Sequence, residues 1–196
     1  MTPPTAFASD ICTFSDWAWN SSSGRAENFR EVEMPRAELL PEQRHSELPC
    51  SICREDQVRI GVGKHSALIC KAIAGDVEEA LRRTEETGFI INSLTGYRVG
   101  RTKGPLDARG LRTQYSHHSF GLAIDINAAQ NGLYDRCIEF GPHCRLRRGG
   151  PWVLGDAGTI SPQTPLYQEM RRAGLKWGGE LKGRQKDFMH FSLQGD

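Results

Sequence analysis

The sequence predicts an α+β fold in which a small antiparallel sheet is flanked by helices. Apolar residues recur at helical spacing over residues 66–88, and Ser66 is suited to cap the start of that helix. Residues 122–127 alternate between apolar and smaller or polar side chains, which is typical of a strand. A second, short helix is expected to begin at Pro165, and residues 189–193 are expected to form a final strand.

Length and composition favour one catalytic domain with an extension. A chain of 196 residues is long enough for one domain with a sizeable core. Residues 1–48 are rich in Ser, Glu, Arg and Pro without a sustained period, so we expect an irregular N-terminal extension there and the main domain over residues 49–196. Within that domain, residues 89–94 are apolar and β-branched enough for a strand, and residues 128–163 have the Gly and Pro content of a long functional loop.

Charge and hydropathy argue against two classes of partner. The chain has 25 Lys and Arg against 24 Asp and Glu, so it lacks the bulk positive charge of a nucleic-acid binder. The sequence has no apolar run of about eighteen residues or more, and residues 1–20 lack the basic start and apolar segment of a signal peptide. We therefore expect neither a membrane span nor an export signal in this chain.

The six cysteines are an even set, but the chain is too long for a disulfide-dominated scaffold. Cys50 and Cys53 have the spacing of half a zinc knuckle or of a redox pair. Because no second Cys-x-x-Cys follows, a disulfide is favoured over structural zinc if the protein works outside the cytosol. The sequence leaves the pairing open.

The long loop carries two further features. Cys137 and Cys144 are placed to close a small loop, which would stiffen a substrate wall. Arg145, Arg147 and Arg148 form a basic cluster, for which a solvated loop is favoured over attraction to anionic cell-wall polymers.

Two distant segments hold the ligands of a mononuclear zinc site. Catalytic zinc takes three protein ligands of N and O type and keeps one position open. The run SHHSFGLAID supplies His118 and Asp125, and the run DFMHF near the C-terminus supplies His190. His117 is adjacent to His118, but the spacing to Gly121 and Asp125 favours His118 as the ligand.

A base for the attacking water is expected beside this metal. Asp187 is the carboxylate nearest in sequence to His190 and is the candidate. Residues three apart on an ideal strand point to opposite faces, so we expect Asp187 to lie in a turn before the strand begins. Gly121 between the first two ligands lets the chain bend into the strand without a side chain in the way.

These residues resemble the zinc D-alanyl-D-alanine carboxypeptidases and L-alanyl-D-glutamate endopeptidases, which are peptidoglycan peptidases related to hedgehog-type domains. The resemblance covers residues 66–193. It implies a hedgehog/DD-peptidase-like fold, one Zn²⁺ held by His118, Asp125 and His190, and Asp187 as the catalytic base.

The resemblance implies roles for three more residues. Arg98, in a Gly-Tyr-Arg run, would steady the scissile carbonyl as it gains negative charge. Ser116 would border the substrate cleft, and Trp177, in a Trp-Gly-Gly turn, would wall it. Residues 137–158 have no counterpart in the family pattern.

The expected function is hydrolysis of a peptide bond in a peptidoglycan stem peptide, either D-Ala-D-Ala or L-Ala-D-Glu, and the sequence leaves this choice open. An alternative is a non-catalytic zinc-containing binding module of the same fold. Asp187 and Arg98 argue against it, because a structural zinc needs neither a base nor an oxyanion partner. A zinc peptidase of ordinary proteins is a third possibility. The expected site of action is the periplasm or cell wall, reached by secretion, by phage release as an endolysin, or by effector delivery.

Overall fold

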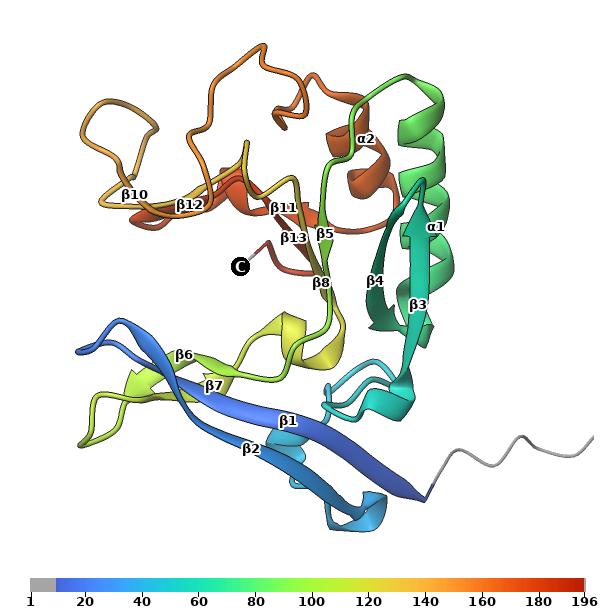
Figure 1. Cartoon of the computed structure of the whole chain (residues 1–196), viewed down its shortest axis with the longest axis vertical. Coiled ribbons are helices and arrows are strands. Elements are labelled where there is room, and N and C mark those ends of the chain that lie inside the picture. The colour runs from blue at the N-terminus through green and yellow to red at the C-terminus, as the bar shows by residue number, and fades with distance from the viewer. Residues whose placement is uncertain (1–9, 196) are drawn as a thin grey trace, which may run out of the picture.

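The computed structural model describes residues 10–195, and its helices and strands form several small layers (Figure 1). The α-helices are α1 (Lys71–Glu86) and α2 (Pro165–Arg172). The strands are β1 (Ile11–Asn20), β2 (Arg25–Pro35), β3 (Gln57–Val62), β4 (His65–Cys70), β5 (Leu94–Thr95), β6 (Arg101–Leu106), β7 (Arg112–Tyr115), β8 (Ala123–Ile126), β9 (Leu133–Asp135), β10 (Arg145–Arg148), β11 (Lys176–Trp177), β12 (Gln185–Asp187) and β13 (His190–Ser192). Short 3-10 helices are η1 (Arg36–Glu38), η2 (Pro41–Gln43), η3 (Arg54–Asp56), η4 (His117–Phe120) and η5 (Gly178–Glu180).

This mixture of elements confirms the α+β class, but the described strands form four sheets where one was expected. The sheet orders are β2-β1-β6-β7, β10-β9-β12, β11-β13-β8-β5 and β3-β4. No helix among residues 10–195 is long and apolar enough to cross a membrane. The expectation about an export signal concerns residues 1–20, of which residues 1–9 lie outside the described part.

The antiparallel sheet β11-β13-β8-β5 lies at the centre of the fold. All four residues of β8 are buried, and Asp125 is in register with His190 on one side and Thr95 on the other. The strands expected over 122–127 and 189–193 are thus present. The strand expected over 89–94 is reduced to β5, because the backbone N–H groups just before it donate to the side chain of Asn127 instead of to a neighbouring strand.

Helices α1 and α2 share one apolar core with this sheet. The core includes Val77 and Leu81 of α1, Leu166 and Met170 of α2, and Ile124 of β8, all fully buried. Helix α2 starts at Pro165 as expected. Helix α1 starts later than expected.

Residues 66–70 belong to strand β4, which pairs with β3 from Gln57↔Cys70 to Val62↔His65. Apolar spacing at 68, 69 and 73 fits a helix and a strand equally well, and pairing with β3 decides between them.

Of the irregular extension expected over residues 1–48, residues 1–9 lie outside the described part, and the structure corrects the expectation for the rest. Strands β1 and β2 form a long hairpin in register from Ile11↔Pro35 to Asn20↔Arg25. It joins the rest of the chain through a parallel pairing of Ala18 with Arg101 in β6. In Figure 1 this hairpin (blue) lies at the opposite end of the molecule from α2. The division into two units at residue 48 stays a prediction.

All six cysteines are paired, as Cys12–Cys53, Cys50–Cys70 and Cys137–Cys144. Cys50 and Cys53 therefore do not pair with each other: each is joined to a different strand. The small loop expected between Cys137 and Cys144 is confirmed.

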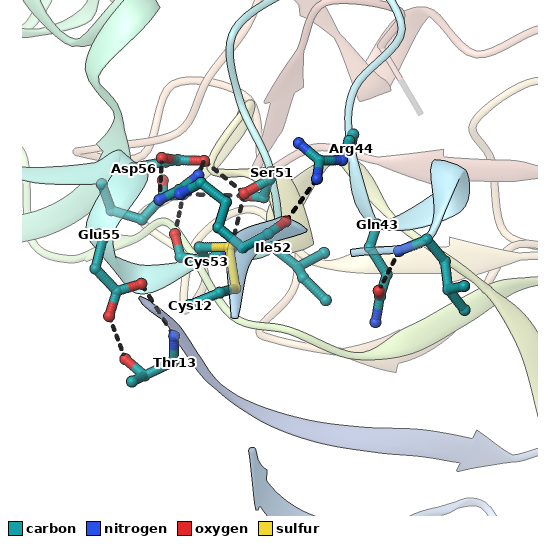
Figure 2. The surroundings of a disulfide bond; sticks show 12 residues. Cys12, Thr13, Gln43, Arg44, Ser51, Ile52, Cys53, Glu55 and Asp56 are labelled. Carbon is teal, nitrogen blue, oxygen red and sulfur yellow. Dashed lines mark hydrogen bonds and ion pairs between the residues drawn. A yellow bond between two sulfur atoms is a disulfide. The ribbon is translucent and has the colours of Figure 1, made fainter. Parts of the chain in front are cut away.

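The Cys12–Cys53 bond fastens β1 to the segment before β3. Figure 2 shows that Thr13, next to this disulfide, donates to the Glu55 carboxylate from both its backbone N–H (3.0 Å) and its hydroxyl (2.6 Å). A covalent bond and two hydrogen bonds thus hold the start of β1.

Candidate metal and catalytic site

The three predicted metal ligands converge on one point. His118 Nε2 lies 3.0 Å from Asp125 Oδ1 and 3.2 Å from His190 Nδ1, and the last two atoms are 2.9 Å apart. Each of the three residues is at most 5% exposed. Ligands about 2.0–2.2 Å from a tetrahedral zinc ion lie roughly 3.3 Å or slightly more from one another, so this triangle is close to the size that zinc requires.

The local backbone explains how a loop residue reaches this point. His118 lies in the 3-10 helix η4, which ends at Gly121 with φ +66°. A Cβ on Gly121 would lie 1.9 Å from Gln57 Oε1 and 2.6 Å from the backbone nitrogen of Cys70. Cys70 in turn donates its N–H to the Gly121 carbonyl at 2.9 Å. Glycine is therefore required at this bend, for both its backbone conformation and its lack of a side chain.

The second ring nitrogen of His118, Nδ1, determines the tautomer and the orientation of the ring. His118 Nδ1 lies 2.8 Å from the carbonyl oxygen of Gly96, so Nδ1 carries the proton and donates. The neutral ring then presents an unprotonated Nε2 to Asp125 and His190. A backbone carbonyl that orients a histidine in this way is a common outer contact of metal ligands. The sequence pointed to Arg98 in the Gly-Tyr-Arg run but gave no sign of this role for Gly96.

Charge also favours a cation at the centre. Burial lowers the pKa of His118 to about 4, so the ring is neutral near pH 7. Burial alone would raise the pKa of Asp125, but interactions with His118 and His190 hold it well below its usual range. Neutral nitrogen and ionised oxygen are the ligand forms that zinc binds.

Arg98 and Asp187 lie beside the triangle. Arg98 Nη2 is 3.2 Å from Asp125 Oδ2, and Arg98 Nη1 is buried without a hydrogen-bond partner in the described chain. The Oδ1 atom of Asp187 is likewise buried and unpartnered there. Burial raises the pKa of Asp187 to about 6, and the Asp125 charge adds to this, while His190 and Arg98 act in the opposite direction.

Asp187 is not in a turn, as had been expected, but ends the separate strand β12. Phe188 and Met189 form a turn before β13, so the rule of alternating faces does not apply between Asp187 and His190. A Cβ on Gly178 would lie 2.5 Å from the Asp187 carbonyl oxygen, so the Trp-Gly-Gly turn packs directly on this segment.

Trp177 and Ser116 occupy different surroundings. Trp177 is 4% exposed and donates its indole N–H to the Phe188 carbonyl at 2.8 Å, so it lies behind the Asp187 segment. Ser116 is partly exposed and lines a pocket of about 330 Å³ together with His45 and Lys103. The two substrate-binding roles stay predictions, and the geometry favours a positioning role for Trp177.

Residues 109–193 match a family model described as D-alanyl-D-alanine carboxypeptidase. The resemblance drawn from the motif residues is thereby confirmed over these residues. The matched segment holds the three candidate metal ligands and Asp187, whereas Arg98 lies before it. No curated protein and no solved structure significantly matches the chain.

Proposed function

We propose that this chain is a zinc metallopeptidase of hedgehog/DD-peptidase-like fold that hydrolyses a peptide bond in bacterial peptidoglycan stem peptides. The observation that carries the proposal is the buried triangle of His118, Asp125 and His190, with the unpartnered carboxylate oxygen of Asp187 beside it. The match to a carboxypeptidase family supports the same class of substrate.

In this proposal His118, Asp125 and His190 hold one Zn²⁺. When bound, such an ion supplies Lewis acidity toward a water molecule and a substrate carbonyl. Asp187 accepts the proton of the attacking water and delivers it to the leaving amine, a role that suits a carboxylate whose pKa burial raises to about 6. Arg98 stabilises the negative charge that develops on the scissile carbonyl oxygen, for which its unpartnered Nη1 is available.

The proposed place of action is the periplasm or cell wall. Three disulfides support it, because such bonds persist in oxidising compartments. Secretion, phage release as an endolysin and effector delivery are all compatible with cell-wall degradation by this chain.

Metal analysis and digestion of purified muropeptides test the proposal. Wild-type protein is expected to hold about one zinc per chain and to release either single D-Ala or a whole stem peptide, which mass analysis separates. His118→Ala is expected to lose both zinc and hydrolysis, whereas His143→Ala, an exposed residue of the loop closed by Cys137–Cys144, keeps them. A wild-type chain that binds zinc but leaves every muropeptide intact would favour the non-catalytic binding module.

A further inference from the structure

Strand β10 brings an arginine to the side of the sheet on which Asp187 lies. In the sheet β10-β9-β12, Arg148 and Asp187 are both in register with Leu133, from its two sides. Side chains of directly paired residues point to the same face of a sheet. Arg148 and Asp187 therefore share a face, with backbones two strand spacings or roughly 10 Å apart.

The backbone around Arg148 is held firmly. Gly149 has φ +74°, and a Cβ there would lie 2.4 Å from the Ala128 carbonyl oxygen. The Gly150 N–H donates to the same oxygen at 2.9 Å. At the other end of β10, the Cys137–Cys144 disulfide closes the connection from β9. Arg148 is thus presented by a hairpin whose two ends are held in place.

The guanidinium of Arg148 is exposed, and within residues 10–195 it makes no hydrogen bond or ion pair. Its neighbour Arg147 differs, because its Nε lies 3.4 Å from Asp135 Oδ2. The charge of Arg148 reaches the site: burial is the largest influence on the pKa of both Asp187 and Arg98, and Arg148 lowers both pKa values in addition.

We propose that Arg148 binds a free carboxylate of the substrate next to the scissile bond, so that the β9–β10 hairpin selects peptides carrying that charge. Arginine and carboxylate form paired, charge-assisted hydrogen bonds, so an exposed arginine on the same sheet face as Asp187 is a suitable partner for an anion. This inference rests on the proposed function. Both candidate bonds offer the group, as the terminal carboxylate of D-Ala or as a carboxylate of D-Glu.

Two matched pairs of peptides test the inference on the zinc-loaded full chain. One pair ends in D-Ala-D-Ala as free acid or carboxamide, and the other carries D-Glu or its amide after L-Ala. For the pair that wild type cleaves, we expect a preference for the free acid. Arg148→Gln should lose that preference through a rise in KM of about tenfold to a hundredfold for the acid, with little change in kcat.

Arg145→Gln is the matched control, because Arg145 is exposed on the same strand but in register with Asp135, further from Asp187. It should keep the preference, and Arg148→Lys should restore part of it. Unchanged KM and preference in Arg148→Gln, or an equal loss in Arg145→Gln, would overturn the inference alone. Absence of cleavage of all four peptides by wild type would overturn the proposed function and this inference with it. Zinc content and melting temperature of each variant identify a folding defect.

Discussion

Two buried carboxylates show how the two ends of this molecule differ. Asp16, in the β1–β2 hairpin, is 1% exposed, and its Oδ2 accepts from Arg30 Nη2 at 2.8 Å and Arg101 Nη1 at 2.7 Å. Asp125, in the candidate site, is 5% exposed, and its Oδ1 faces two histidine nitrogens at 2.9 and 3.0 Å. Two arginines compensate the first carboxylate, whereas the second has one arginine, Arg98, at its Oδ2 and two histidines, which can themselves bind a cation, at its Oδ1.

The difference teaches that burial of a charge does not by itself indicate a site. The Asp16 cluster joins strands β2, β1 and β6 and ends in the aromatic ring of Tyr115, over which the Arg101 guanidinium lies at 4.7 Å. Its partners are fully charged at every pH of interest. The Asp125 cluster has partners that change form with pH or metal, which is what a reactive centre requires.

Replacement of the two kinds of carboxylate should give the largest contrast. Asp187→Asn removes the proposed base and is expected to lower kcat on muropeptides by about 10²- to 10⁴-fold, with zinc content unchanged. Asp16→Asn should leave kcat of the folded protein unchanged while lowering its free energy of unfolding by about 1–3 kcal/mol, since both arginines are partly exposed. Equal loss of kcat in both variants would contradict the contrast.

Removal of the hairpin disulfide Cys12–Cys53 should cost more stability than removal of Cys137–Cys144, which lies between β9 and β10. Cys12–Cys53 spans 41 residues and Cys137–Cys144 spans 7. Loop-closure entropy predicts losses of about 4 and about 2 kcal/mol when each pair is replaced by alanine. Urea unfolding of the two double variants measures the two losses of free energy. A larger loss for the shorter loop would show that the β1–β2 hairpin is held mainly by contacts other than the Cys12–Cys53 bond.

Replacement of Gly121, at the bend beside His118, should lower the stability of the protein. Gly121→Ala is expected to cost about 3 kcal/mol, because the backbone is left-handed and the Cβ meets Gln57 and Cys70. Gly75→Ala in α1 is the control: a Cβ there meets nothing within 4 Å, so stability should rise by about 0.5–1 kcal/mol. Thermal unfolding distinguishes them, and a neutral Gly121→Ala would show that this contact can relax.

The smallest expected effects lie within the Asp16 cluster. Arg30 is 60% exposed and Arg101 29%. Arg30→Ala should therefore cost less than about 1 kcal/mol, and Arg101→Ala about 2 kcal/mol, since it also loses the Tyr115 contact. The order of the two melting temperatures is the readout. A reversed order would mean that the Arg30–Asp16 ion pair stabilises strand β2 more than the exposure of Arg30 indicates.

Sequence reasoning reached the candidate site because its chemistry is local. Two ligands lie within one run of the chain, the bend glycine lies between them, and the third ligand is on a strand with a clear apolar pattern. Only the pairing of β8 with β13, which sets Asp125 against His190, had to be assumed. The hydrogen bond from His118 Nδ1 to the Gly96 carbonyl depends on how the loop folds. Any residue at position 96 has a backbone carbonyl, so the residue type does not predict this bond.

The hairpin was missed because the buried face of β1 mixes polar with apolar residues. In β1 the inward residues include Asp16 and Asn20, while Trp17 and Trp19 face outward. Alternation is present, but polar residues stand where an apolar face is expected. Asp16 is tolerated inside only because of Arg30 and Arg101, which are distant in sequence. Charge compensation across strands cannot be recognised from one strand.

The Cys50–Cys70 bond ends at the residue whose backbone N–H holds the Gly121 carbonyl. Oxidation of one cysteine pair therefore secures the peptide group that supports the His118 turn. Without the Cys50–Cys70 bond, no disulfide holds the Cys70 backbone that donates to Gly121. Because disulfides do not persist under reducing conditions, we expect the support of the His118 turn to weaken there.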